Sequence, residues 1–282
     1  MSFSAKVILD SINPHNGIRL ITSELTYPRF IHSEFMTHRL FSRNAASSRA
    51  IPTRKMIKMV SDNPAMPIYW GKDKSGMSAE EALGDIEQDN AQRMWLAASD
   101  DAVMWAKKLL KLGAHKQIVN RILEPWKWMT VIVSTTQTSN FLALRDHEDA
   151  QPEIAHVARL WRGVMNESTP VEREWHIPYI QDDEQLLNLQ LRRKLGTARC
   201  ARVSYLTHDG IRDTDKDVEL YERLLTGGSS GHWSPFEHVA KATDEMEVRR
   251  NFVTGAKESS PIWCGNFQGW IQWRKLHNGE CQ

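Results

Sequence analysis

The chain has 282 residues, which is enough for one large domain or two small ones. Its 36 basic residues nearly balance 35 acidic ones, so the protein as a whole is not a polyanion binder and any anion recognition must be local. No apolar run is long enough to span a bilayer, the N-terminus lacks a signal-peptide core, and the three cysteines have no metal-ligand spacing. We therefore expect a cytoplasmic protein with no membrane contact, no metal site and no disulfide framework.

The first predicted elements are two short β-strands, KVILDSINP and GIRLITSELT, broken by the turn dipeptides Asn-Pro and Asn-Gly. Thr26 is then placed to cap a helix that has Pro28 in its first turn and runs to Phe41. On such a helix Glu34 and His38 would share one face, because side chains four residues apart lie one above the other.

A long helix is expected after an irregular stretch at 43–76. The capping-box pair Ser78 and Glu81 marks its start, and Gly113 marks its end. Apolar residues recur within it at intervals of three and four, which predicts a buried face. The residues of that face are Trp95, Ala98, Ala102, Trp105, Leu109 and Leu112.

The second half of the chain begins with WMTVIVSTT, which is β-branched and predicts a strand. SNFLALRDHEDAQ and PEIAHVARLWRGVM predict helices that are interrupted near Pro152. A polar stretch at 166–190 is expected to link two parts of the chain. A further helix is predicted at 215–226, ended by Gly227 and Gly228.

Residues 38–49, HRLFSRNAASSR, contain three arginines and three serines and no acid. Arginine forks match phosphate oxygens two at a time, and hydroxyl and amide groups can complete the shell around them. A solvated basic loop is the alternative, but the apolar residues in and around the segment argue against full exposure. The segment therefore predicts a site for a phosphorylated ligand.

Other candidates are less specific. Arg145, five residues after Asn140 on a predicted helix, could stabilise negative charge developing on a heteroaromatic ring, although the residues alone favour an exposed arginine in surface ion pairs. Arg121 could be a helix-end cation or a phosphate clamp, and the sequence leaves both open. His232 and His238 lack a third ligand with supporting spacing, so no metal site is expected there. No dinucleotide fingerprint, P-loop or nucleophile elbow is present.

Three blocks of the sequence keep the internal spacing of one family's signatures. In the first block, Thr37-His38-Arg39 is followed, after seven residues, by Ser47-Ser48-Arg49. The corresponding family signature is R-H-R, followed after seven residues by S, which continues as S-x-R. NFLALR at 140–145 with AQPEI at 150–154 corresponds to N-F-L-x-L-R and A-Q-x-E-I. ARVS at 201–204 and GHWSPFEH at 231–238 correspond to A-R-V-S and G-H-x-T-P-F-E-H. Together the blocks resemble the flavin-dependent thymidylate synthases.

The order of the blocks differs from the usual family, in which the third block precedes the first. The chain therefore resembles a circularly permuted, virus-type member, and permutation is tolerable when the original termini lie close together at the surface. The resemblance implies a single domain of α+β class, with a mixed or antiparallel sheet and packed helices. Its parts would be the family's C-terminal part at 1–165 with a helical insert near 78–113, the relocated N-terminal part at 195–240, and an extra tail at 241–282.

The resemblance also implies cofactors, partners and residue roles. It implies a homotetramer with shared active sites that binds FAD, dUMP or dCMP, and methylenetetrahydrofolate as one-carbon donor, with NADPH as a candidate reductant. Nucleic acid and membranes are not expected partners, and a viral protein would work in the host cytoplasm. The FAD contacts would be His38, Arg39, Asn140, Ser204, His232 and Ser234. The nucleotide contacts would be Glu34, Ser47, Ser48, Arg49, Arg121 and Arg145, with Arg145 as the catalytic residue that polarises the pyrimidine ring.

Departures from the family motif leave the reaction open. The leading arginine of R-H-R is Thr37, and the family's glutamate is Ala45. Methylation of dUMP to dTMP is the first interpretation. Hydroxymethylation of dUMP or dCMP is the second, because Glu34 could accept a hydrogen bond from an exocyclic amine or from water. A catalytically silent nucleotide-binding protein is the third, and RNA binding is disfavoured by the neutral overall charge.

Overall fold

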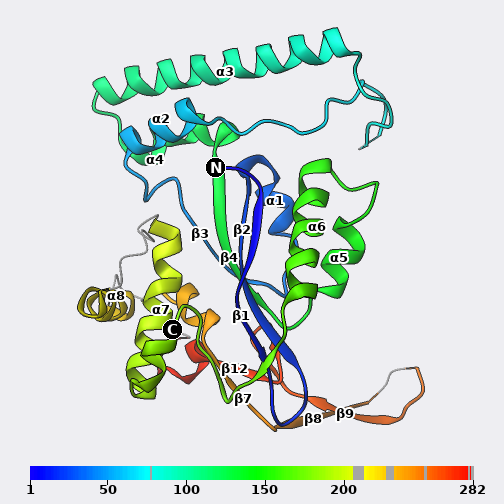
Figure 1. Cartoon of the computed structure of the whole chain (residues 1–282), viewed down its shortest axis with the longest axis vertical. Helices are drawn as coiled ribbons and strands as arrows, with labels where there is room; N and C mark the ends of the chain where they lie inside the picture. Colours follow the sequence, from blue (N-terminus) through cyan, green and yellow to red (C-terminus); the bar gives the residue numbers. More distant parts are fainter. Residues whose placement is uncertain (77, 206–212, 227–231, 251–252, 279, 281–282) are drawn as a thin grey trace.

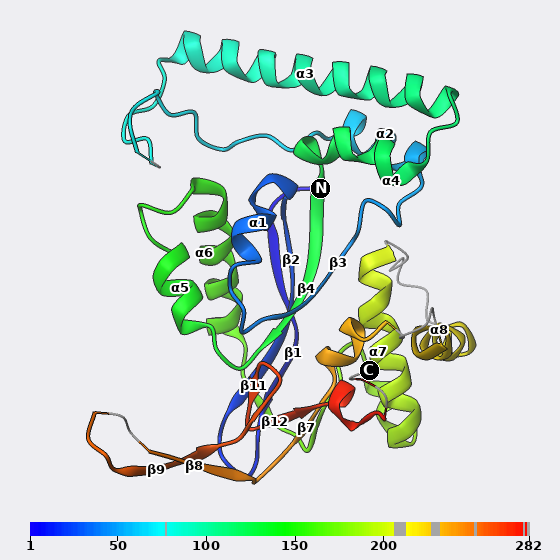
Figure 2. The same ribbon diagram turned by 180° about the vertical axis from the view of Figure 1, so that it is seen from behind.

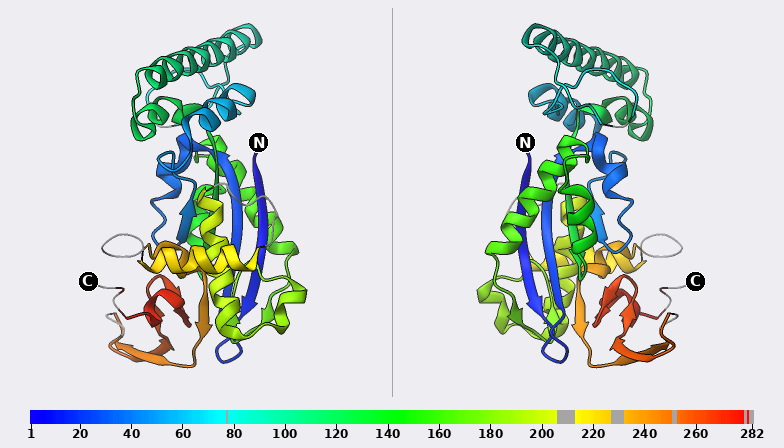
Figure 3. Two further views of the ribbon diagram at one scale, coloured as in Figure 1. Left: turned by 90° about the vertical axis from the view of Figure 1, so that its left-hand side faces the viewer. Right: turned by 90° about the vertical axis from the view of Figure 1, so that its right-hand side faces the viewer.

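The computed structural model describes residues 1–76, 78–205, 213–226, 232–250, 253–278 and 280. These residues form an elongated molecule with a twisted sheet at its centre, helices on both faces of the sheet, a helical layer at one end and small sheets at the other (Figures 1 and 3). None of the described helices combines the length and the apolar character that crossing a membrane requires.

The central sheet has five strands in the order β3–β4–β2–β1–β5 (Figure 1). The strands are β1 Ser4–Ile12, β2 Arg19–Pro28, β3 Ser42–Ala45, β4 Trp128–Thr135 and β5 Val171–Glu172. β1 and β5 pair in parallel, and the other neighbours are antiparallel. The mixed sheet confirms the expected α+β class, and the β1–β2 hairpin and β4 confirm the strands predicted at those positions.

Two helices, α5 (Ser139–Arg145) and α6 (Pro152–Glu167), cover one face of the sheet and confirm the helices predicted there. Alternate side chains of β2 and β4 point toward α6, as the two-residue period of a strand requires. Trp161 of α6 is fully buried in this core, and its indole Nε1 donates to Ser23 Oγ of β2 at 2.9 Å. The helix that carries Arg145 is thereby fixed to the sheet.

The opposite face is covered by α7 (Leu189–Tyr205), whose Cys200 and Val203 pack on Ile132 of β4. The helix α8 (Thr214–Thr226) packs on α7 and confirms the helix predicted at 215–226, while Gly227 and Gly228 lie outside the described residues. A buried cation joins these elements, because Arg199 of α7 donates to both Glu184 oxygens at 2.6 Å and to Asp217 of α8 at 2.8 Å.

A helical layer lies at one end of the sheet (Figures 1 and 2). It comprises α2 Thr53–Asp62, α3 Asp85–Lys111, α4 Lys116–Val119 and the 3₁₀ segment η2 Asn120–Trp126. Residues 43–76 are thus not irregular throughout. The capping-box prediction at Ser78 and Glu81 is wrong, because α3 begins at Asp85 after Gly84, whose conformation is extended.

The predicted buried face of α3 is confirmed only in part. Ala102 and Leu109 pack against the core shared with α2, α4 and η2, and the Trp95 indole donates to the carbonyl of Ala65 at 2.9 Å. The residues fully buried are Ser99, Val103 and Ala106, which pack on α2, α4 and η2. Trp105 is 53% exposed and Leu112 82% exposed. These exposed residues recur with the same helical period as the inward ones, so periodicity alone could not tell which of them face α2.

The C-terminal part forms small sheets at the other end of the molecule (Figure 2). Its elements are β6 Trp175–His176, the 3₁₀ segments η3 Asp182–Leu186, η4 Ser234–His238 and η5 Trp273–Leu276, and the strands β7 Ala240–Ala242, β8 Met246–Arg250, β9 Lys257–Pro261, β10 Trp263–Cys264, β11 Phe267–Gln268 and β12 Trp270–Gln272. The stretch at 166–190, expected as a polar link, supplies β5, β6 and η3. Trp270 is fully buried and donates to the carbonyl of Ile18, which ties the tail to the β1–β2 hairpin.

Candidate functional site

The segment before the basic stretch is not the long helix predicted from Thr26. β2 continues to Pro28, a 3₁₀ turn covers Arg29–Ile31, and α1 spans only His32–Phe35. Thr26 lies within the β2–β4 ladder, where its hydroxyl contacts that of Thr130 at 3.0 Å. Cross-strand pairing with β4 therefore outweighs the local capping preference, and the following residues turn toward α5.

Arg145, at the end of α5, meets three residues of this turn. Its Nε donates to His38 Nε2 at 3.1 Å, its Nη1 lies 3.4 Å from Glu34 Oε2, and its Nη2 lies 3.5 Å from Thr37 Oγ1. The Arg145 side chain is 23% exposed and that of Glu34 32% exposed. The cluster joins the first and second sequence blocks, although their residues are more than a hundred positions apart.

His38 is held as a neutral acceptor for Arg145. Its side chain is buried, with the ring 4.8 Å from that of Phe141, edge to face, and 5.9 Å from that of Phe41. Burial lowers the pKa of His38 to about 4, helped by the nearby charges of Arg145 and Arg43. A neutral imidazole whose Nε2 accepts a hydrogen bond carries its proton on Nδ1, so His38 can orient the Arg145 guanidinium at any pH near neutrality.

Arg43 of β3, which belongs to the basic segment, supports the main chain of the turn. Its Nη1 lies 3.3, 3.2 and 2.9 Å from the carbonyl oxygens of Phe35, Met36 and His38, to which it donates. Burial lowers the pKa of Arg43 from its ordinary value. This cation therefore fixes the loop that carries His38 and is not available in full to a ligand.

A second cluster lies at the other end of β3, around Glu124 of η2. Ser48 Oγ and Arg121 Nη1 both donate to Glu124 Oε1, at 2.5 and 2.7 Å, and Arg29 Nη2 lies 3.8 Å from Oε2. Ser48 and Glu124 are largely buried, and the Arg121 side chain is half-exposed. Two of the expected phosphate contacts thus share the carboxylate of Glu124, which lies in none of the motif blocks.

Buried donors hold the main chain of this loop from behind. Lys127 Nζ donates to the carbonyl of Ala46 at 2.9 Å, and Asn120 Nδ2 donates to the carbonyls of Ser48 and Ile51 at 2.7 and 2.9 Å. Burial lowers the pKa of Lys127 to about 8. No motif in the sequence indicated that Lys127 and Asn120 hold the main chain of this loop.

The remaining loop side chains point outward. Ser47 and Arg49 are exposed, as are Arg39 and Asn140 at the Arg145 end. Within the described parts of the chain no acid pairs with Arg39 or Arg49. These four groups are therefore donors that a bound anion or cofactor can reach without breaking an internal ion pair.

The third block approaches the first through Asn44 of β3. Ser234 Oγ of η4 donates to Asn44 Oδ1 at 2.7 Å, and Asn44 Nδ2 lies 3.5 Å from the carbonyl of Cys200 on α7. His232 is exposed, and the side chain of Ser204 lies outside the described residues. All three blocks thus converge on the segment 37–49, despite their altered order along the chain.

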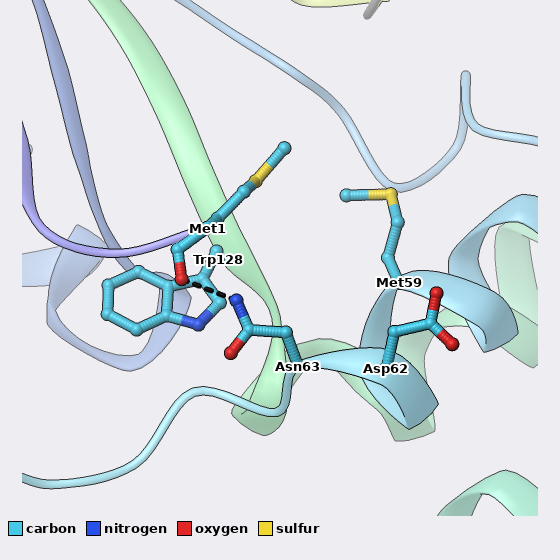
Figure 4. A pocket seen from close by; sticks show the side chains of 5 residues that line it. All are labelled: Met1, Met59, Asp62, Asn63 and Trp128. Atoms are coloured by element: carbon cyan, nitrogen blue, oxygen red, sulfur yellow. Dashed lines mark hydrogen bonds between the residues drawn. The ribbon is translucent and has the colours of Figure 1, made fainter.

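A small cavity of about 190 Å³ lies apart from the predicted residues, between the start of the chain and α2 (Figure 4). It is lined by Met1, Met59, Asp62, Asn63 and Trp128, and Asn63 Nδ2 donates to the carbonyl of Met1. None of the expected cofactor or substrate contacts lines it. Among the described residues, no group of three His, Cys, Asp or Glu side chains could hold a metal ion.

A comparison with models of protein families agrees with the sequence resemblance. The family model described as thymidylate synthase complementing protein matches residues 20–171, just over half of the chain. The UMP/dUMP methylase PolB from Streptomyces cacaoi bound with 5-Br dUMP is 19% identical, with a TM-score of 0.45 over 53% of this chain and 67% of that chain. The same methylase bound with 5-Br UMP is 15% identical, with a TM-score of 0.49 over 59% and 89%. A search of curated proteins found no match.

Proposed function

Because this chain belongs to the thymidylate synthase complementing protein family, that of the flavin-dependent thymidylate synthases, we propose that it transfers a one-carbon group to carbon 5 of a deoxypyrimidine monophosphate. The reaction we favour converts dUMP to dTMP with methylenetetrahydrofolate as the donor. The observation that carries the proposal is the contact of Arg145 with His38 and Glu34, which joins two motif blocks at one partly buried cation.

Arg145 is suited to polarise a pyrimidine ring. Its Nε is firmly held by neutral His38, whereas its two Nη contacts, at 3.4 and 3.5 Å, are at the limit of hydrogen bonding. A pyrimidine carbonyl can replace those long contacts without disturbing the anchored Nε. Because the side chain is mostly shielded from water, its charge acts strongly on a ring that becomes anionic as carbon 5 attacks the one-carbon unit.

The nucleotide phosphate would bind at the loop 46–51. Arg49 and Ser47 offer exposed donors there, and Arg121 and Ser48 would join them by sharing or exchanging the carboxylate of Glu124. Arginine forks bind phosphate through paired hydrogen bonds, so Arg49 would contribute most to affinity.

Exposed donors at the Arg145 end fit an anionic cofactor. Arg39 and Asn140 would contact FAD, with His38 and His232 nearby, and Ser234 would contact it if its hydroxyl leaves Asn44. When bound, reduced FAD supplies the electrons of the methylation, with NADPH as the candidate reductant. Threonine at position 37 removes one cation from the flavin site, so we expect weak retention of the cofactor.

The arrangement of the two clusters supports a shared site. They lie at opposite ends of β3, and β3 spans about 13 Å at the usual rise of a strand. A homotetramer in which one protomer's phosphate loop faces a neighbour's Arg145 cluster would complete the site. We also propose that residues 195–240 are the relocated N-terminal part of a permuted family fold, because Ser234 and Cys200 contact Asn44 of the first block.

Glu34 favours a second candidate, hydroxymethylation of dCMP or dUMP. Its carboxylate lies beside Arg145 and can accept a hydrogen bond from the exocyclic amine of cytosine or from a water molecule. Water, in place of hydride, would then quench the exocyclic methylene intermediate and leave a hydroxymethyl group.

One assay tests these candidates. The purified protein would be incubated with FAD, NADPH, methylenetetrahydrofolate and either dUMP or dCMP. The mass of the nucleotide product would then be measured by mass spectrometry. Gain of a methyl group on dUMP supports the proposal, and gain of a hydroxymethyl group supports the second candidate. Nucleotide binding without any product in either reaction would contradict both and favour a silent nucleotide-binding protein.

A further inference from the structure

A groove in the helical layer lies outside every residue assigned to the proposed reaction. It runs between α2 and α3 and has a volume of about 400 Å³, within the range of small-molecule sites. It is lined by Arg54 of α2, by Lys107 and Lys111 of α3, and by the apolar side chains of Ile57 and Leu110. The groove therefore combines three cationic side chains with an apolar surface (α2 and α3 are side by side in Figures 1 and 2).

The two segments that form the groove and its surroundings are basic. Residues 49–63 and 102–127 carry ten lysines and arginines but only two acids, Asp62 and Glu124. These residues have a net charge of +8, while the whole chain has +1, so the remainder carries −7. The first part of α3 carries acids such as Asp85, Glu87 and Asp89, so the excess of cations is local to the groove, where it raises the concentration of anions.

Internal interactions do not account for the three cations. Within the described parts of the chain no acid pairs with Arg54, Lys107 or Lys111, whereas Lys58 of the same helix pairs with Asp62 at 2.7 Å. Lys111 lies in the last turn of α3, where the helix dipole favours a cation. Arg54 lies in the first turn of α2, where the dipole disfavours a cation, and that turn contains no acid and no side-chain cap.

The spacing of the groups defines the chemistry of a ligand. Lys107 and Lys111 are one turn apart, about 6 Å along the helix, with Leu110 between them on the same face. Arg54 and Ile57 form the same pairing of charge and apolar side chain on α2. A ligand that fits must carry several negative charges separated by, or attached to, a short apolar segment.

We infer that this groove is a binding site for a small organic polyanion, with three or more negative charges beside an apolar segment. Two sources have this chemistry: the oligo-γ-glutamyl chain that a folate can carry, and a nucleoside triphosphate. A nucleoside monophosphate has too few charges to engage all three cations, so the site differs in selectivity from the proposed phosphate loop at 46–51. Binding at the groove does not depend on the proposed reaction.

The test is isothermal titration calorimetry of the whole protein with four probes. These are tetrahydropteroyl pentaglutamate and monoglutamate, and dTTP and dTMP, each titrated in the presence of saturating dUMP. The groove variant is Arg54→Ala/Lys107→Ala/Lys111→Ala, in which all three altered side chains are exposed. The control variant Lys6→Ala/Lys241→Ala/Lys257→Ala removes three exposed cations from strands β1, β7 and β9.

We expect the pentaglutamate or dTTP to bind the wild type about tenfold or more tightly than the groove variant, and tighter than its shorter counterpart. The control variant should bind each probe as the wild type does. The long probe that binds shows whether the ligand is an oligo-γ-glutamyl folate or a nucleoside triphosphate. If the groove variant and the control variant lose affinity for a long probe equally, the probe is attracted by the net charge of the protein alone, and the groove is not a binding site. Equal affinity of the groove variant and the wild type for both long probes would also overturn the site, as would a wild type that prefers neither long probe to its shorter counterpart. A protein that fails to bind dUMP would refute the proposed function but leave this comparison intact.

Discussion

Replacing Glu124 by glutamine should tighten the binding of a nucleoside monophosphate. Glu124 Oε1 accepts from both Ser48 Oγ and Arg121 Nη1, so its negative charge lies at the centre of the expected phosphate site. Glutamine keeps a carbonyl oxygen for those two donors and removes the charge. The loop 46–51 should stay in place, because Lys127 and Asn120 hold its carbonyl oxygens independently.

The size of the effect follows from the electrostatic repulsion that the substitution removes. A phosphate bound on the far side of Arg121 would lie about 6 Å from the Glu124 carboxylate, which at an effective dielectric constant of about 20 gives about 3 kcal/mol per pair of unit charges. Screening by physiological salt reduces this by about half. We therefore expect Glu124→Gln to strengthen dUMP binding by about 1–2 kcal/mol, or about five- to thirtyfold.

Calorimetric titration of dUMP into wild type and Glu124→Gln measures this directly. A matched control is Glu222→Gln, because Glu222 also accepts from a cation, Lys194, at 2.5 Å but lies on α8, outside the site. The control should leave dUMP affinity unchanged. Unchanged or weaker binding by Glu124→Gln, with an unfolding transition like that of the wild type, would refute the phosphate site at this loop.

Three further expectations follow from the same contacts. Arg49→Ala should weaken dUMP binding by about 2 kcal/mol, as loss of a charged hydrogen-bonded group does, and near-normal affinity by calorimetry would remove Arg49 from the phosphate role. Arg145→Ala should reduce product formation in a single-turnover assay far more than it reduces dUMP affinity, and unchanged turnover would remove its ring-polarising role. Burial lowers the pKa of Lys127 from 10.5 to about 8, so between those pH values the unfolded chain binds more protons and stability rises with pH. The unfolding free energy of wild type relative to Lys127→Met should therefore rise by about 3 kcal/mol from pH 8 to 10.5, and parallel pH profiles in urea titrations would contradict this.

Much of the fold was predictable because its local signals agree with its packing. The β1–β2 hairpin, β4, α5, α6 and α8 all occur where hydrophobic period and turn residues place them. The errors arise where two local signals compete. Thr26 and Pro28 have the composition of a helix start, but β4 pairs with this segment over its full length. A contact between residues a hundred positions apart cannot be read from a capping rule.

The residues of the candidate site were predictable from the sequence, but their hydrogen-bond and ion-pair partners were not. The spacing of the blocks identifies Arg49 and Arg145, and the family resemblance adds Arg121. Neither indicates that Arg121 donates to Glu124 or that His38 accepts from Arg145. Such partners depend on how η2 and α5 approach β3, which only the fold determines. Glu124 had no motif to mark it, although it accepts from Ser48 and Arg121, two of the expected phosphate contacts.

The hydrogen-bond partners also show why counting cations in a motif overstates its capacity for ligands. Of the three arginines in residues 38–49, Arg43 directs its Nη1 to three main-chain carbonyls, while Arg39 and Arg49 remain exposed. Burial lowers the pKa of Arg43, so its charge already carries a desolvation cost that the carbonyls offset. Replacing Arg43 would therefore disturb the turn that holds His38 before it affected any phosphate. The anion-binding capacity of the segment rests on its two exposed arginines, one at each end of β3, and this distribution fits the proposal of a flavin at one end and a nucleotide phosphate at the other.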